Sequence, residues 1–182
     1  MVRLFIAVPV PQNIKEQVTG LIADLKNVQG LPENIRFVPE ENWHFTLVFL
    51  GYQDELVNPA IKKSIANILT SDVNNIEIQF EKLTYGPPGR TPRMLWLTVT
   101  KETSAAMDEL KTALEKNLEE EGVRWRKENR PFQGHLTLAR FEPISPIDLP
   151  KIDKKVDFGY STEEINLMKS TLKRTGAEYE VL

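Results

Sequence analysis

The chain has 182 residues, no cysteine and a formal net charge of −3. A chain of this length can bury the core of one domain, or of two small lobes, without a disulfide. The lack of cysteine excludes a disulfide framework, a thiolate nucleophile and a cysteine metal site. The first apolar run, Leu4–Val10, is short and broken by Pro9, so it is neither a signal peptide nor a membrane span. We expect a monomeric protein of the cytoplasm.

The spacing of apolar residues predicts an alternation of strands and helices along the chain. Alternating or continuous short apolar runs are typical of strands, and apolar residues three or four apart are typical of helices. Strands are expected at 4–8, 36–38, 43–51, 76–81, 94–100, 123–125, 164–172 and 177–181. Helices are expected at 14–26, 59–69 and 104–120. The Gly/Pro-rich stretch 86–93 is expected to join two lobes.

Both histidines of the chain begin the same short unit, His-x-Thr-Leu, at His44 and at His135. Because side chains alternate between the two faces of a strand, each histidine shares a face with the threonine two residues later, Thr46 or Thr137. In the first unit, Phe45, Leu47 and Phe49 are then expected on the opposite face, in the core. A single unit of this kind is a weak signal, because threonine is common in strands and a lone histidine is usually structural.

The two units lie in a repeated pattern of strand, helix, short strand and histidine motif. Leu4 precedes His44 by 40 residues, and Leu95 precedes His135 by the same interval. The pattern covers roughly 3–51 and 94–142 and resembles a structural repeat more than a sequence repeat. It predicts one bilobal domain over 1–182, with related lobes about a pseudo-twofold axis and both imidazoles lining one groove.

Two histidines that face one phosphorus can act as an acid–base pair near neutral pH. The neutral ring takes a proton from an attacking water or hydroxyl, and the protonated ring gives one to the departing oxygen. The hydroxyls of Thr46 and Thr137 can donate hydrogen bonds to the non-bridging oxygens. A metal is not required, and a zinc site is disfavoured because zinc usually has three or four protein ligands.

The residues of several segments together resemble a known family. These segments are Arg3–Pro9, Glu41–Leu47, Pro92–Trp96, Arg130–Phe132, His135–Arg140 and Gly176–Leu182. The chain resembles the two-histidine (2H) phosphoesterases, and within them the RNA 2′,3′-cyclic phosphodiesterases, historically called 2′-5′ RNA ligases (LigT-like). The resemblance implies an α+β, bilobal fold, in which antiparallel sheets line a central groove and helices pack outside.

The resemblance also implies an activity, without metal or cofactor: hydrolysis of RNA 2′,3′-cyclic phosphate ends to 2′-phosphomonoesters. It implies that His135 activates water, that His44 protonates the leaving 3′-oxygen, and that Thr46 and Thr137 hold the phosphate. The residues alone leave the two histidines equivalent. The reverse reaction would join ends through a 2′-5′ linkage. Val48 stands where the family often carries Lys, which removes one possible phosphate contact.

Four arginines are candidates for binding RNA: Arg93, Arg126, Arg130 and Arg140. Arg126 and Arg130 belong to a basic segment that also contains Trp125 and can follow phosphates and stack a base; a solvated strand edge is the alternative. The family has an arginine at position 140. Strict alternation turns Arg140 away from His135, so its use needs a twist, a bulge or a strand end. Trp43 and Trp96 are expected in the core.

Two other functions remain open at this point. The same fold can hydrolyse cyclic phosphates on ADP-ribose or other small nucleotides, or act on a 2′-5′ oligonucleotide. Alternatively, the chain is a module that binds RNA ends without turnover. An assay with 2′,3′-cyclic nucleotides in excess chelator separates binding from catalysis.

Overall fold

The computed structural model describes residues 1–70, 75–128, 132–152, 154–173 and 176–182. The helices are α1 (Gln12–Lys26), α2 (Asn58–Leu69) and α3 (Lys101–Glu120). The predicted helices are therefore confirmed, with α3 starting three residues earlier. Its start is fixed by Thr100, whose hydroxyl accepts a hydrogen bond from the Thr103 backbone N–H at 3.2 Å.

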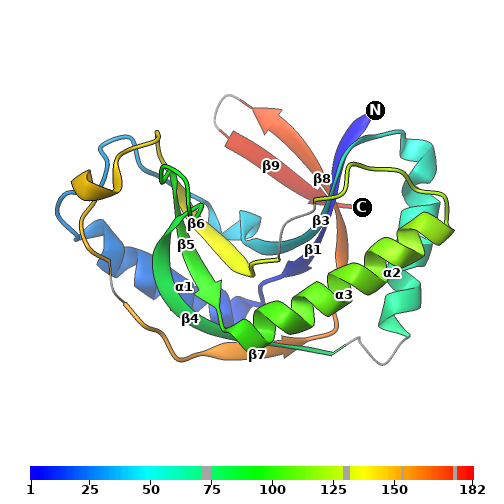
Figure 1. Ribbon diagram of the computed structural model, residues 1–182, viewed down its shortest axis with the longest axis horizontal. Helices are drawn as coiled ribbons and strands as arrows, with labels where there is room; N and C mark the ends of the chain where they lie inside the picture. The colour runs from blue at the N-terminus through cyan, green and yellow to red at the C-terminus, as the bar shows by residue number, and fades with distance from the viewer. Residues whose placement is uncertain (71–74, 129–131, 153, 174–175) are drawn as a thin grey trace.

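Within the described residues the strands form two antiparallel sheets, which confirms the α+β fold. The first sheet has the order β3-β1-β8-β9, and the second has the order β2-β6-β5-β4-β7. Figure 1 shows β4, β5 and β6 on one side of the molecule and β1, β3, β8 and β9 on the other. The strands are β1 (Val2–Pro9), β2 (Arg36–Phe37), β3 (His44–Gln53), β4 (Ile76–Gly86), β5 (Met94–Val99), β6 (His135–Arg140), β7 (Gly159–Thr162), β8 (Asn166–Lys173) and β9 (Gly176–Val181).

The two histidine motifs occupy matching places in the two sheets. In the first, β1 pairs antiparallel with β3, and α1 lies between them in the chain. In the second, β5 pairs antiparallel with β6, and α3 lies between them in the chain. Each histidine is the first residue of its strand. The repeat of strand, helix and histidine strand is thus present. The short strand before the histidine strand occurs in the first half, as β2, but the described residues of the second half contain no counterpart.

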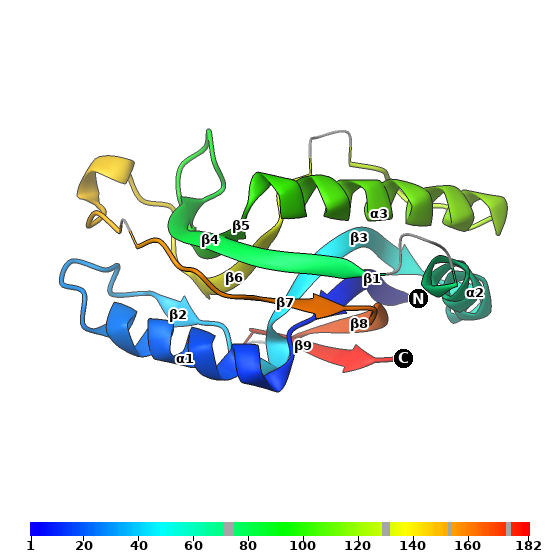
Figure 2. The same ribbon diagram turned by 90° about the horizontal axis from the view of Figure 1, so that it is seen from below.

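The chain passes between the sheets several times. It crosses from β1 to β2, returns from β2 to β3, crosses again from β3 to β4, and returns from β7 to β8. Apolar side chains of both sheets consequently join one core cluster, which contains Ile6 and Val8 of β1 as well as Leu95 and Leu97 of β5. Figure 2 shows α1 and α3 on opposite sides of the strands, so the helices cover the sheets from outside.

Two expectations are wrong, and one strand was missed. The stretch 123–125 is not a strand: Val123 is buried, but its backbone N–H bonds to the Leu118 carbonyl and closes the end of α3. The stretch 86–93 does not join lobes, because β4 and β5 are hydrogen-bonded neighbours in one sheet. Glycine and proline favour a tight hairpin as much as a linker. Strand β7 was not expected, because its four residues carry no apolar alternation.

Candidate active site

His44 is held by its backbone neighbour at the start of β3. Its Nδ1 lies 2.8 Å from the carbonyl oxygen of Asn42. A carbonyl oxygen can only accept, so Nδ1 carries the hydrogen and donates it. In the neutral ring Nε2 is then unprotonated, and it lies 3.1 Å from the hydroxyl oxygen of Thr46. The predicted pairing of His44 and Thr46 on one face is confirmed.

The surroundings of His44 disfavour its charged form. Burial lowers the pKa of His44 below the ordinary value of 6.5, the hydrogen bond to Asn42 opposes this, and the nearby Arg140 guanidinium lowers it further. Two aromatic rings supply much of the burial: the ring centroids of Phe5 and Tyr179 lie 4.8 Å and 5.0 Å from that of His44. His44 is therefore mainly neutral near pH 7 in the ligand-free protein.

His135 repeats this anchoring at the start of β6. Its Nδ1 lies 2.8 Å from the carbonyl oxygen of Gln133, again two residues earlier in the chain. The same argument gives a hydrogen on Nδ1, so that Nε2 is the basic nitrogen of the neutral ring. Both histidines thus use Nδ1 for a hydrogen bond to the backbone, and Nε2 is the basic nitrogen of each neutral ring.

An indole ring supports the imidazole of His135. Trp96 stacks on His135 with ring centroids 3.7 Å apart and an interplanar angle of 23°. Trp96 is buried, as expected, but it packs against a site residue as well as against the core. The space for its ring comes from Gly86 on the next strand, where an added Cβ would lie 2.5 Å from Trp96 Cδ2.

A β-bulge interrupts each histidine strand at the leucine of the His-x-Thr-Leu unit. In β3, Ile6 pairs with Val48 and Ala7 pairs with Thr46, which leaves Leu47 as the extra residue. In β6, Leu95 pairs with Ala139 and Trp96 pairs with Thr137, which leaves Leu138 as the extra residue. A bulge shifts the alternation by one position. The residue five places after each histidine therefore returns to the histidine face.

In β6 the bulge brings Arg140 to the side of the histidines. Arg140 pairs with Met94 on β5 and donates a hydrogen bond from Nη1 to the Met94 sulfur at 3.3 Å. Its charge also lowers the pKa of His44, a residue of the other sheet. Strict alternation, which turned Arg140 away from His135, fails here because Leu138 is the extra residue.

In β3 the corresponding residue is Phe49, which was expected in the core. The bulge at Leu47 turns Phe49 outward, and its side chain is 39% exposed. The guanidinium carbon of Arg3 lies 4.8 Å from the centre of the ring. Val48 takes the buried place instead, 2% exposed. Val48 itself therefore lies on the face opposite the histidines. The loss of a phosphate contact through the absence of the family's Lys stays a prediction.

The two histidine strands are brought together by the chain between β2 and β3. Strand β2 pairs with β6, and the pairing is extended by the Val38 N–H, which donates to the Leu138 carbonyl at 2.8 Å. A short turn at Glu40–Asn42 then leads directly into His44. Strands β3 and β6 contact each other although they belong to different sheets. That both imidazoles reach a single phosphate stays a prediction.

The other predicted arginines lie in different places. Arg93 is exposed directly before Met94, the strand partner of Arg140. Arg126 is exposed and follows Arg124, whose carbonyl accepts a hydrogen bond from Gln53 at the opposite end of β3 from His44. At about 3.3 Å per strand residue, this end is on the order of 30 Å along the strand from His44. A role for Arg126 in binding RNA stays a prediction. Arg130 lies outside the described residues.

Sequence reasoning missed Phe49 as a site residue and the stacking of Trp96 on His135. One signal for Phe49 is present in the sequence. Phe49 follows His44 by five residues, as Arg140 follows His135. A shared bulge makes the two positions equivalent, but alternation alone assigns both to the wrong face.

Within the described part of the chain, no three His, Asp or Glu side chains stand together as a metal site. None of the described helices has the length and apolar character of a membrane-spanning helix.

Comparison with known proteins identifies the family. The sequence profile of the 2′-5′ RNA ligase superfamily matches residues 10–172. A Methanocaldococcus jannaschii protein named RNA 2′,3′-cyclic phosphodiesterase is 29% identical over 187 residues, which cover 99% of this chain and 98% of the relative. A Bacillus subtilis protein of the same name is 31% identical over 136 residues, which cover 75% of this chain and 69% of the relative.

Solved structures have the same fold. The crystal structure of TT0787 of Thermus thermophilus matches with a TM-score of 0.76 and 26% identity, covering 99% of this chain and 94% of that one. Escherichia coli LigT complexed with 3′-AMP matches with a TM-score of 0.74 and 23% identity, covering 100% and 95%. The predicted resemblance is thus confirmed: the chain belongs to the 2′-5′ RNA ligase superfamily.

Proposed function

We propose that this protein hydrolyses the 2′,3′-cyclic phosphate at the end of an RNA to a 2′-phosphomonoester, without a metal, through its two histidines. The observation that carries the proposal is the duplicated anchoring of His44 and His135. Each ring donates Nδ1–H to a carbonyl two residues earlier, and each histidine shares a strand face with the threonine two residues later. The names of the relatives supply the substrate class.

The proposed reaction uses the two Nε2 atoms in opposite roles. His135 Nε2 takes a proton from water while the water oxygen bonds to phosphorus. The bond from phosphorus to O3′ breaks, and His44 Nε2 gives its proton to O3′. Negative charge is spread over the non-bridging oxygens in the transition state, where the hydroxyls of Thr46 and Thr137 and the guanidinium of Arg140 stabilise it. The assignment of acid and base follows the family resemblance.

The lowered pKa of His44 is compatible with this role once substrate is bound. In the free protein, burial and the Arg140 charge keep the ring mainly neutral. A cyclic phosphate carries one negative charge, and its binding between His44 and Arg140 would offset the guanidinium and favour the imidazolium. The substrate thereby helps to protonate the acid that it needs.

Phe49 gives this site a surface for a nucleobase. Its ring is exposed on the histidine face of β3, and Arg3 packs against it. Aromatic rings stack on every base because each base has a π-face. We therefore assign the terminal base to Phe49 and its phosphate to the space between β3 and β6.

The test is hydrolysis of a short oligoribonucleotide that ends in a 2′,3′-cyclic phosphate, measured in excess chelator. We expect turnover to a 2′-phosphate, identified by ³¹P NMR. His44→Ala and His135→Ala should each reduce kcat by a factor on the order of 10²–10⁴, because each removes one proton transfer. Retained turnover in either variant, or turnover abolished by chelator, contradicts the proposal. Tight binding without turnover by the unchanged protein would instead support an RNA-end-binding module.

A further inference from the structure

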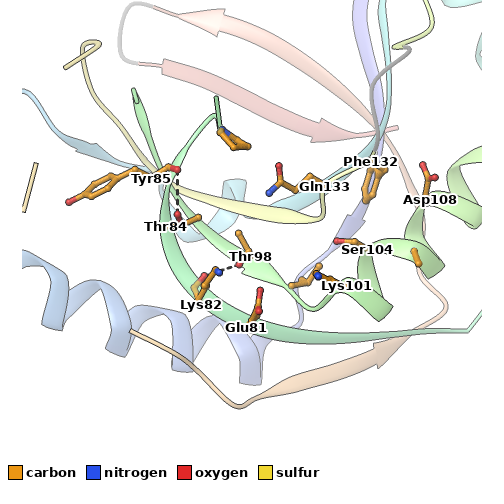
Figure 3. Close-up of a pocket in the computed structure, with 13 residues that line it drawn as sticks. Glu81, Lys82, Thr84, Tyr85, Thr98, Lys101, Ser104, Asp108, Phe132 and Gln133 are labelled. Atoms are coloured by element: carbon orange, nitrogen blue, oxygen red, sulfur yellow. Dashed lines mark hydrogen bonds between the residues drawn. The ribbon is translucent and has the colours of Figure 1, made fainter. Parts of the chain in front are cut away.

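A pocket continues the histidine face of the second sheet beyond His135. Its volume is about 560 Å³, within the range of roughly 300–1,000 Å³ that small-molecule sites occupy. Residues of β4, β5 and the first turns of α3 line it. Figure 3 shows Thr98, Lys101, Ser104 and Gln133 gathered around the same space. None of these side chains has a role in the reaction proposed above.

The strand register places this pocket beside His135. Lys82 on β4 pairs with Thr98 on β5, which pairs with His135 on β6. Directly paired residues share a face, so these three side chains form one row across the sheet. Neighbouring strands are about 4.8 Å apart, which places Lys82 about 10 Å from His135. Gln133, a lining residue, also holds His135 through its carbonyl.

The pocket and strand β3, which carries His44, meet different strands around His135. Strand β3 contacts β6, whereas the pocket is built on β5 and β4, the next strands in the sheet. In phosphoryl transfer the attacking and leaving oxygens lie roughly in line through phosphorus. With His44 at the leaving 3′-oxygen, the attacking oxygen comes from the side of His135. The pocket therefore opens where the nucleophile enters.

The lining favours an uncharged, partly polar group over a chain of phosphates. The positive charges of Lys82 and Lys101 are balanced by the negative charges of Glu81 and Asp108, which also line the pocket. Ser104 and Gln133 supply hydrogen-bonding groups, and Phe132 supplies an aromatic ring. A nucleoside with a free 5′-hydroxyl has this character, because its attacking oxygen carries no phosphate.

We propose that this pocket binds the nucleoside at the 5′-hydroxyl end of a second RNA strand; the inference rests on the proposed function. The 5′-oxygen bonds to phosphorus, and His135 takes the hydroxyl proton. The bond from phosphorus to O3′ breaks, and O3′ receives the proton of His44. The product is a 2′-5′ phosphodiester, and no water is consumed. The reverse reaction returns a cyclic phosphate and a 5′-hydroxyl.

A substitution that fills the pocket tests this proposal, and the chain offers a matched control. Ala105 lines the pocket, and Ala106 is the next exposed residue of α3 and does not line it. The two reactions are hydrolysis of 2′,3′-cyclic AMP and cleavage of a 2′-5′-linked diadenosine monophosphate. Only the second needs the pocket. Relative to the unchanged protein, Ala105→Trp should reduce the rate of 2′-5′ cleavage at least about tenfold, which corresponds to a loss of about 1.4 kcal/mol of binding free energy. It should leave the rate of cyclic AMP hydrolysis within about twofold.

Every other outcome is decisive. Ala106→Trp should match the unchanged protein in both reactions, and equal effects of the two variants would overturn the pocket assignment.

Absence of 2′-5′ cleavage by the unchanged protein would overturn it as well. If Ala105→Trp slows instead the hydrolysis of a dinucleotide that ends in a cyclic phosphate, the pocket holds the preceding nucleotide. If the unchanged protein hydrolyses neither 2′,3′-cyclic AMP nor the oligoribonucleotide with a cyclic phosphate end, the proposed function itself is wrong. Lys82→Ala and Lys101→Ala, both exposed on the folded protein, give the same comparison without a bulky residue.

Discussion

A histidine that is buried beside a cation releases its proton more readily than one in water, and His44 is in this position. Burial and the Arg140 guanidinium both lower its pKa below 6.5. A pair of one acid and one base is active when it holds one proton in total, whichever ring carries the proton. At low pH, once both rings are protonated, the base is lost.

We predict a bell-shaped profile of kcat/KM against pH, with a limb on the acid side whose midpoint lies below 6.5. In Arg140→Gln this limb should move to higher pH, because removal of the cation raises the pKa of His44. Arg90→Gln, which removes an exposed arginine of the β4–β5 hairpin, serves as the control and should leave the limb in place. A profile that is flat from about pH 5 to 9, or a limb unmoved by loss of Arg140, would contradict this account.

Phe49 carries the second prediction at this scale. Stacking of a base on an aromatic side chain is worth about 1–3 kcal/mol, so Phe49→Ala should reduce kcat/KM for cyclic nucleotides by roughly 5- to 150-fold. Phe49→Trp should keep most of the activity. Leu56→Ala removes an exposed apolar side chain elsewhere and controls for a general surface effect. Equal kcat/KM in Phe49→Ala and Leu56→Ala would show that no base stacks there.

At the scale of elements, the packing of β4 against β5 sets the orientation of His135. Trp96 stacks on His135, and its ring occupies the space that Gly86 leaves open. We predict that Gly86→Ala forces the indole to move and lowers kcat more than it changes KM, because the substrate still binds but His135 is misplaced. Trp96→Phe should restore part of the loss in kcat when it is added to Gly86→Ala, since the smaller ring leaves room for the methyl group.

The control for this prediction is Gly20→Ala in α1. An added Cβ at Gly20 has no neighbour within 4 Å, and alanine in a helix interior is favoured over glycine by about 1 kcal/mol. Gly20→Ala should therefore leave kcat unchanged and raise the melting temperature. If Gly86→Ala affects only the melting temperature, Trp96 packs the core and does not position His135.

The same element scale explains which parts of the site the sequence could predict. The three helices and most strands followed from apolar spacing, and the sharing of a face by His44 and Thr46 followed from strand alternation. Phe49 and Arg140 did not, because each lies beyond a bulge that is invisible to a two-residue period. The strand expected at 123–125 was wrong because a buried valine, here Val123, can also lie at the end of a helix.

The pocket beyond His135 could not be predicted at all. Its lining comes from β4, β5, the start of α3 and the residues before β6, which are distant in sequence. The side-chain row from Lys82 through Thr98 to His135 depends on strand register, and register depends on the whole sheet. The mixture of charged, polar and aromatic residues there has no sequence motif.

For the whole molecule, the relation between the two histidine strands depends on how the chain crosses between the two sheets. β2 belongs to the sheet of His135, and seven residues beyond its end the chain reaches His44 in the other sheet. The apolar side chains of both sheets form one core cluster, so the histidine strands keep their relation to each other as the core packs. A local change that loosens one sheet is therefore expected to disturb both histidines.

The most direct test of this account uses the fact that the chain contains only two histidines. A long-range ¹H–¹⁵N spectrum of the imidazoles, recorded on protein without added histidines, resolves each Nε2. Titration with the product nucleoside 2′-monophosphate should shift both Nε2 resonances along curves with one dissociation constant, because one phosphate contacts both rings. If only one Nε2 shifts, or if the two follow different dissociation constants, the histidines do not act on a common phosphorus.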